Sequence, residues 1–157
     1  MLLLNGDCID EMQKLIDDGV FVIGIDNLND YYDVSLKNYR LKQLEVSSLN
    51  KSSWHFYKIS IEDYKSLLKV FKEHKPHIVI NLAAQAGVRY SLINPKSYVD
   101  SNIVGYFNVL DFCKSENIKL IYASSSSVYG ENENQLSLED NQATDQKSFY
   151  ALTKKIG

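Results

Sequence analysis

Apolar runs alternate with amphipathic stretches along the chain. Five short apolar runs are typical of buried strands: 1–4, 20–26, 54–60, 77–83 and 119–125. Between them, apolar residues at helical spacing predict helices at 7–18, 35–48, 62–74 and 95–116, with another from about residue 148. Gly19 is expected to end the first of these helices. Strands that alternate with helices predict an α/β fold, a parallel sheet with helices on both faces.

The composition of the chain limits the classes of protein to which it can belong. The length of 157 residues suits one domain, and the net charge of −3 gives no electrostatic footprint for nucleic acid. No apolar run is long enough for a membrane span, and the N-terminus lacks the basic region of a signal peptide. Cys8 and Cys113 have no metal-ligand spacing, so we expect no metal site. We expect both to be buried thiols of a cytoplasmic protein.

The polar stretch 130–148 predicts a surface loop.

Candidate chemistry gathers where the strands end, since ligands bind beyond the carboxyl ends of strands in such sheets. Asp26 ends the second strand and could accept the hydroxyls of an adenosine ribose, or it could simply form a turn before Asn27. "SSSSVYG" (124–130) leaves the fifth strand. Its Ser125 could hydrogen-bond a substrate hydroxyl, or the run could be an ordinary serine-rich turn.

Tyr150 and Lys154 lie four residues apart at the start of the last helix, on one face. A lysine ammonium favours the phenolate form of a nearby tyrosine, which makes that tyrosine a plausible general base. Composition alone produces about one Tyr-x-x-x-Lys by chance, so the pair needs its context.

The context is supplied by three longer stretches: "GIDNLNDYYDVSLKNYRL", "NLAAQAGVRYSLINPKSYVDSNIVGYFNVL" and "YASSSSVYG". Over about residues 13–155 the chain resembles the extended short-chain dehydrogenases/reductases of the nucleotide-sugar epimerase/dehydratase group, and most of all the UDP-glucuronate 4-epimerases, including capsule-type enzymes. The resemblance implies a Rossmann-like doubly wound sheet, here incomplete at the C-terminus. Residues 1–157 would be an NAD-binding domain without the C-terminal substrate domain. It also implies NAD as cofactor, a UDP-sugar as substrate and a homodimer.

The resemblance also assigns roles to residues. Ser125, Tyr150 and Lys154 match the catalytic residues, and Tyr150 and Lys154 also contact the cofactor. The other cofactor-binding positions are Asp26, Asn27, Ala83, Ala84, Gln85 and Asn102. The substrate-binding positions are Arg89, Ser91 and Ser126. An arginine at 89 could pair with a phosphate or a uronate carboxylate, or it could form a surface ion pair.

The implied reaction is a 4-epimerisation through a transient 4-keto sugar. Tyr150 removes the proton of the sugar 4-hydroxyl, and the C4 hydride passes to NAD⁺ and returns on the opposite face. A 4,6-dehydratase or reductase of the same family is the first alternative, although Ser126 and Ser127 stand where a dehydratase usually has an acidic pair. A non-catalytic remnant that binds full-length relatives is the second.

The N-terminus departs from the family. Members of the family carry a Gly-x-x-Gly-x-x-Gly loop, whereas Gly6 is followed here by Ile9 and Met12 at the next two positions. Side chains there would obstruct the approach of a pyrophosphate, and the charge of Asp7 would repel it. We therefore expect this chain to bind NAD weakly or not at all. We do not assume that it is catalytically active by itself. The chain also ends inside a predicted helix, which suggests a truncated protein.

Overall fold

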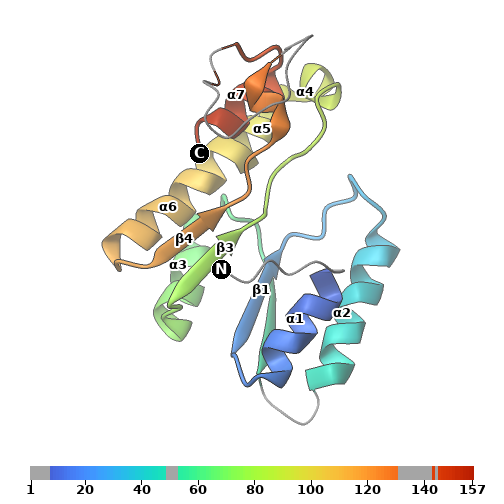
Figure 1. Cartoon of the computed structure of the whole chain (residues 1–157), viewed down its shortest axis with the longest axis vertical. Helices are drawn as coiled ribbons and strands as arrows, with labels where there is room; N and C mark the ends of the chain where they lie inside the picture. Colours follow the sequence, from blue (N-terminus) through green and yellow to red (C-terminus); the bar gives the residue numbers. More distant parts are fainter. Residues whose placement is uncertain (1–7, 49–52, 131–142, 144) are drawn as a thin grey trace. The chain divides into compact units, whose positions relative to one another are not determined.

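The computed structural model describes residues 8–48, 53–130, 143 and 145–157, and the chain divides into two compact units, residues 1–59 and 60–157 (Figure 1). Each unit holds one pair of parallel strands with helices packed on it. The strand predicted at residues 1–4 and most of the loop predicted at 130–148 lie outside the described residues. Within the described part of the chain, no helix is long and apolar enough to cross a membrane.

The first unit begins with α1 (Cys8–Asp17), which packs on α2 (Val34–Ser48) and on β1 (Val22–Asp26). Ile16 of α1 and Leu44 of α2 are its most buried side chains. Gly19 has a φ of +81°, a left-handed conformation that glycine adopts without steric cost. The backbone N–H groups of residues 19 and 20 bond to carbonyls in the last turn of α1, so the predicted helix end is confirmed.

The strand pair of this unit joins β1 to β2 (Trp54–Lys58), from Val22 opposite Trp54 to Asp26 opposite Lys58. The indole of Trp54 lies across Gly24 on the neighbouring strand. A Cβ atom added at Gly24 would come within 2.4 Å of the Trp54 ring, so the close packing requires glycine there.

The second unit is built on β3 (Ile78–Asn81) and β4 (Lys119–Tyr122), which pair in parallel. In Figure 1, α6 (Tyr106–Ser115) runs beside both strands, and α3 (Tyr64–His74) packs on α6. The rings of Phe71 and Phe112 meet between these two helices with centroids 5.1 Å apart. Ile78 and Ile80, at alternate positions of β3, are each about half exposed.

The predicted long helix 95–116 is continuous but not uniform. It begins as α5 (Pro95–Tyr98), continues as a π-helical segment η1 (Val99–Gly105), and ends as α6. Backbone angles stay in the right-handed helical region where the segments join. π-Helical turns are rare and are often found at functional sites.

Three short elements complete the second unit. They are α4 (Tyr90–Ile93) after β3, the 3₁₀ helix η2 (Ser126–Tyr129) after β4, and α7 (Phe149–Lys155). The sequence predicted α7 but neither α4 nor η2. Of these, α4 follows the carboxyl end of β3, and η2 follows that of β4. Helix α7 contacts both of them, as well as α5 and η1.

The two strand pairs agree with a Rossmann-type fold. In the doubly wound order, the first strand separates the second and third strands from the fourth and fifth. Of the five strands predicted from the sequence, the second and third are observed as β1 and β2, which pair with each other. The fourth and fifth are observed as β3 and β4, which also pair with each other.

Candidate functional site

The segment after β4 presents the serines predicted to act on a substrate. Ser125 adopts an extended conformation and caps η2, because its Oγ accepts a hydrogen bond of 3.3 Å from the backbone N–H of Ser127. The Ser125 hydroxyl proton is not donated to any described residue, so it is available to a ligand. Ser125 is half-buried and Ser126 is exposed. The segment is therefore a turn capped by Ser125, as the interpretation of a serine-rich turn predicted. The Ser125 hydroxyl can still donate a hydrogen bond to a ligand.

Helix α7, which carries Tyr150 and Lys154, is in contact with η2. Ser148 starts the helix, and its Oγ accepts a hydrogen bond of 3.0 Å from the N–H of Ala151. The Tyr150 ring stacks edge-on against the buried ring of Tyr98, with centroids 6.0 Å apart. The helix end, the cap and the aromatic contact together fix the direction of the Tyr150 side chain.

Lys154 is buried, with only 4% of its surface exposed. Its Nζ lies 4.2 Å from the centroid of the Tyr122 ring. Among the described residues, this ammonium has no hydrogen-bond or ion-pair partner. Burial lowers the pKa of Lys154 and raises the pKa of Tyr122 to about 12, the latter also through the nearby phenols of Tyr106 and Tyr150. A buried ammonium with unsatisfied donors is suited to bind the hydroxyl groups of a ligand.

Asn102, in the π-helical segment, links the loop after β3 to α7. Its Oδ1 accepts from the backbone N–H of Gln85 at 2.7 Å, and its Nδ2 donates to the Gln85 carbonyl at 3.0 Å. The same Nδ2 donates to Thr153 Oγ1 at 3.0 Å, and Thr153 Oγ1 donates to the Tyr150 carbonyl at 2.8 Å. Asn102, Thr153 and Gln85 are all buried. This network connects two predicted site segments through the protein interior.

The loop after β3 holds the remaining predicted cofactor positions. Ala83 is exposed and Ala84 half-buried, and the Ala83 N–H donates to Asn81 Oδ1 at 3.1 Å. Asn81 Nδ2 is buried and has no hydrogen-bond partner among the described residues. The hydroxyl of Tyr98 is within hydrogen-bonding distance of the Ala86 carbonyl, at 2.7 Å. Within this loop, the Ala83 N–H and the Ala86 carbonyl are therefore already engaged by neighbouring side chains.

Arg89 and Ser91 follow in the same loop and in α4. Arg89 is exposed and forms no ion pair with any described residue. The described residues therefore do not support the alternative interpretation of Arg89 as part of a surface ion pair. Ser91 is 1% exposed, and its hydroxyl donates to the Val88 carbonyl at 2.6 Å. Arg89 is therefore free to meet an anion, whereas the proton of Ser91 is already engaged.

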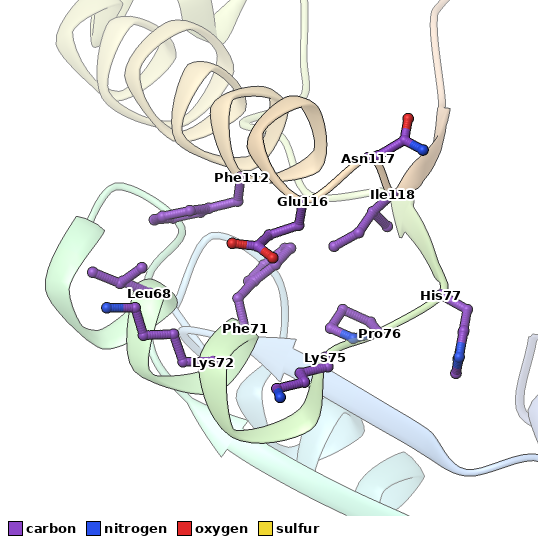
Figure 2. A pocket seen from close by; sticks show the side chains of 10 residues that line it. All are labelled: Leu68, Phe71, Lys72, Lys75, Pro76, His77, Phe112, Glu116, Asn117 and Ile118. Atoms are coloured by element: carbon purple, nitrogen blue, oxygen red, sulfur yellow. The ribbon is translucent and has the colours of Figure 1, made fainter.

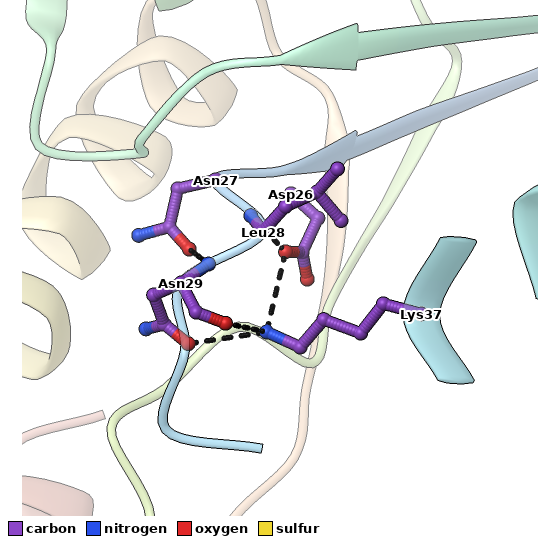
Figure 3. Close-up of polar contacts among 5 residues, drawn as sticks. All are labelled: Asp26, Asn27, Leu28, Asn29 and Lys37. Carbon is purple, nitrogen blue, oxygen red and sulfur yellow. Dashed lines mark hydrogen bonds and ion pairs between the residues drawn. The ribbon is translucent and has the colours of Figure 1, made fainter. Parts of the chain in front are cut away.

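Asp26 and Asn27 lie at the end of β1 in the first unit, and Figure 3 shows their contacts. Asp26 Oδ1 accepts from the N–H of Leu28 at 2.6 Å and lies 3.8 Å from Lys37 Nζ. Asn27 Oδ1 accepts from the N–H of Asn29 at 3.0 Å. The Asp26 side chain remains half exposed. Asp26 therefore stabilises a turn through Oδ1, as the interpretation of a turn-forming aspartate predicted. Its second carboxylate oxygen, Oδ2, could still accept a hydrogen bond from a ligand.

The first turn of α1 is where a dinucleotide pyrophosphate would be expected to bind. Asp10 and Glu11 occupy this turn, and Glu11 pairs with Lys14 at 2.7 Å. Negative side chains here interact favourably with the helix dipole but oppose a second anion. Gly6 and Asp7 lie outside the described residues.

A pocket of about 380 Å³ lies elsewhere in the second unit (Figure 2). Phe71 and Phe112 contribute to its apolar wall, and His77 and Ile118 line it just before β3 and β4 begin. It is therefore at the amino ends of these strands, whereas the predicted site residues follow their carboxyl ends. None of those site residues lines this pocket.

Sequence reasoning missed three residues that support the site: Tyr98, Tyr122 and Thr153. Thr153 is three residues after Tyr150, so helical spacing could have placed it beside the tyrosine's backbone. Tyr98 and Tyr122 gave no such signal, because tyrosine is frequent in this chain and their contacts come from distant segments.

Comparisons with known proteins show the family of the chain. A family model described as GDP-mannose 4,6 dehydratase matches residues 11–157. Protein CapI of Staphylococcus aureus is 51% identical over 144 residues, covering 91% of this chain and 42% of that protein. UDP-glucuronate 4-epimerase of Thermodesulfobacterium geofontis (strain OPF15) is 44% identical over 142 residues, covering 90% of this chain and 42% of that protein.

Among solved structures, the UDP-glucose 4-epimerase of Thermus thermophilus in complex with NAD has a TM-score of 0.75 at 25% identity. The match covers 94% of this chain and 44% of that one. The chain thus spans less than half the length of the relatives it matches. From the extent of the family match and the identity to its relatives, the chain belongs to the GDP-mannose 4,6-dehydratase family of NAD-dependent epimerases and dehydratases.

Proposed function

We propose that this chain is the NAD-binding domain of a nucleotide-sugar 4-epimerase of the type that interconverts UDP-glucuronate and UDP-galacturonate. One observation carries the proposal: the buried ammonium of Lys154 has no partner among the described residues and shares a helix with Tyr150, beside the Ser125 turn. The identity to a UDP-glucuronate 4-epimerase supports the choice of sugar. The buried, unpaired thiol of Cys113 is consistent with a cytoplasmic location.

The described residues fit the ribose groups of NAD. Lys154 would donate to the nicotinamide ribose, and Asp26 with Asn27 would bind the adenosine ribose. The loop residues Ala83, Ala84 and Gln85 would border the cofactor, and Asn102 would hold that loop through its two bonds to Gln85. When bound, NAD would accept the hydride from C4 of the sugar and return it to the opposite face, through a 4-keto sugar.

The side chains of α7 and η2 would handle the proton. Tyr150 would act as general base toward the sugar 4-hydroxyl, and the Lys154 ammonium would stabilise its phenolate. Ser125 would donate its free hydroxyl proton to the same sugar oxygen and so orient it. Holding these groups on capped, packed elements would keep them aligned before the substrate binds.

The exposed residues of the two loops would meet the sugar nucleotide. Arg89, without an ion-pair partner among the described residues, would bind a phosphate or the uronate carboxylate. Ser126 would hydrogen-bond the sugar. Ser91, whose proton is donated to the Val88 carbonyl, could offer the substrate only an acceptor.

NAD binding is the first test. The acidic first turn of α1 and the side chains of Ile9 and Met12 predict weak binding by the chain as it stands. Calorimetry would compare it with the double variant Ile9→Gly/Met12→Gly, and with that variant carrying Lys154→Met. We expect binding to strengthen with the glycines and to be lost again with Lys154→Met. Micromolar binding by the unaltered chain would contradict the pyrophosphate argument, and no effect of Lys154→Met would contradict the assigned role of the lysine.

Catalysis requires a second test, because the relatives are more than twice as long as this chain. Residues 11–157 would replace the matching part of the Thermodesulfobacterium geofontis enzyme, and products from UDP-glucuronate would be separated by anion-exchange chromatography. We expect UDP-galacturonate from this chimera and none after Tyr150→Phe. A 4-keto-6-deoxy product would favour a dehydratase, for which Ser126 and Ser127 leave no acidic side chain beside Ser125. NAD binding without any product would favour a non-catalytic role.

We also propose that the chain forms a homodimer through the helix that includes η1 and α6. Val104, Phe107 and Leu110 project from it at helical spacing and are 43%, 60% and 41% exposed. Light scattering after size exclusion should give twice the mass of 18.0 kDa. The variant Phe107→Glu should give a monomer, and a monomeric unaltered chain would contradict the proposal.

A further inference from the structure

The ring of Tyr122 is held on three sides. Tyr122 is the last residue of β4, where it is paired with Asn81 of β3. Tyr106 of α6 packs against it, with ring centroids 4.6 Å apart. Near the end of the chain, a Cβ atom added at Gly157 would come within 2.4 Å of the Tyr122 ring. The ring therefore has little freedom to move away from Lys154.

Tyr122 makes two separate contacts with Lys154. Its ring face lies 4.2 Å from Nζ, and its hydroxyl donates to the Lys154 backbone carbonyl at 3.3 Å. The carbonyl bond ties down the helical turn that carries the lysine. The ring face meets the charge itself, because the aromatic quadrupole attracts a cation placed over it.

No described side chain forms an ion pair with the Lys154 ammonium. Near the Tyr122 ring lie the phenols of Tyr106 and Tyr150 and the last residue of the chain, Gly157, whose carbonyl oxygen is 3.5 Å from the Tyr106 hydroxyl. Without the ring, a buried ammonium in this position would lose the one attractive contact that the described residues give it. The flexible lysine stem would then let the charge move toward water.

We infer that Tyr122 is a positioning residue for Lys154: its ring holds the ammonium inside the site, and its hydroxyl fixes the turn of α7 that bears it. The contact itself is independent of the proposed function. What the ammonium is held ready to bind, the ribose of NAD, rests on that proposal. Tyr122 acts through Lys154 and is not assigned any contact with substrate.

Competitive labelling with trace acetic anhydride, read by mass spectrometry, measures how accessible and how deprotonated each lysine is. It would be applied to the chain itself and to Tyr122→Phe and Tyr122→Leu, with the exposed Lys155 as internal reference. We expect Tyr122→Phe, which keeps the ring, to change Lys154 labelling by less than about fivefold. Tyr122→Leu should raise it by about thirtyfold, the size expected for a desolvated cation–π contact. A rise below fivefold in Tyr122→Leu would overturn the inference.

A second series separates ring electrostatics from packing, in case Tyr122→Leu loosens α7. Phenylalanines with one, two and three ring fluorines at position 122 change the ring volume little but weaken its attraction for a cation stepwise. Labelling of Lys154 should rise with each fluorine, while hydrogen exchange of the Leu152 amide, bonded to the Ser148 carbonyl, stays constant. A flat series would overturn the inference. Neither series needs NAD. The failure of NAD to protect Lys154 from labelling in the Ile9→Gly/Met12→Gly variant, which is expected to bind NAD, would count against the proposed function alone.

Discussion

Replacing Asn102 by alanine should disconnect α7 from the loop after β3. The change removes three hydrogen bonds, two with the backbone of Gln85 and one with Thr153. Each is worth about 1 kcal/mol net, and leaving buried backbone groups unpaired adds to the cost. With Asn102 only 2% exposed, water cannot readily replace the lost partner. We therefore expect a loss of about 3 to 4 kcal/mol in the stability of this region.

Hydrogen exchange followed by mass spectrometry is the suitable assay, because it reports local stability and does not require the whole chain to unfold in one step. The Gln85 amide, which donates to Asn102, and the amides of α7 should exchange faster in Asn102→Ala. The amides of α3, which packs on α6, should change less.

Asn108→Ala is the matched control. Asn108 lies in the same continuous helix and is similarly buried, but its Nδ2 donates to the carbonyls of Ile61 and Glu62 instead. Its loss should cost about 1 to 2 kcal/mol and leave α7 protected, since only acceptors lose a partner. If Asn102→Ala leaves the Gln85 amide as protected as Asn108→Ala does, the network does not hold the site together and the reasoning is refuted.

Three further predictions follow from the packing and the titrating groups. Gly24→Ala should destabilise the first unit by about 1 to 3 kcal/mol in urea unfolding followed by circular dichroism, because its methyl group would meet the Trp54 ring; unchanged unfolding would contradict this. Stability should fall as pH rises from 10 toward 12, because Tyr122, with its pKa raised to about 12, keeps its proton in the folded state after an unfolded tyrosine has lost it. Tyr122→Phe should flatten that decline in pH-dependent denaturant melts, and an equally steep decline would point to other groups. Ser148→Ala should weaken the start of α7 by about 1 kcal/mol, seen as faster exchange of the Ala151 amide, whereas Ser148→Asp should restore the cap.

The sequence predicted the regular elements well because their signal is local. The helix expected at 7–18 is observed as Cys8–Asp17, and the strand expected within 77–83 as Ile78–Asn81. Hydrophobic spacing and a glycine at the helix end are sufficient for such elements. The π-helical turn at Val99–Gly105 was not predicted, because its residues show ordinary helical spacing and its hydrogen-bond pattern depends on what Asn102 and its neighbours contact.

The candidate site was only partly predictable for a related reason. The positions of Ser125, Tyr150 and Lys154 came from resemblance, and their assigned roles stay predictions. What the sequence could not indicate is how they are held, since the contact of Lys154 with Tyr122 joins residues 32 positions apart. Pairings over such separations are decided by the packing of helices on strands, and no local pattern encodes them.

The position of Trp54 has a practical consequence. It is the one tryptophan of the chain, and it lies in the first unit with its indole against the backbone of Gly24. Emission excited at the red edge of tryptophan absorption therefore reports the unfolding of residues 1–59 alone. The tyrosine signals of near-ultraviolet dichroism come from both units. Recording the two on one sample would show whether the halves of this small protein melt together or in sequence, without any label.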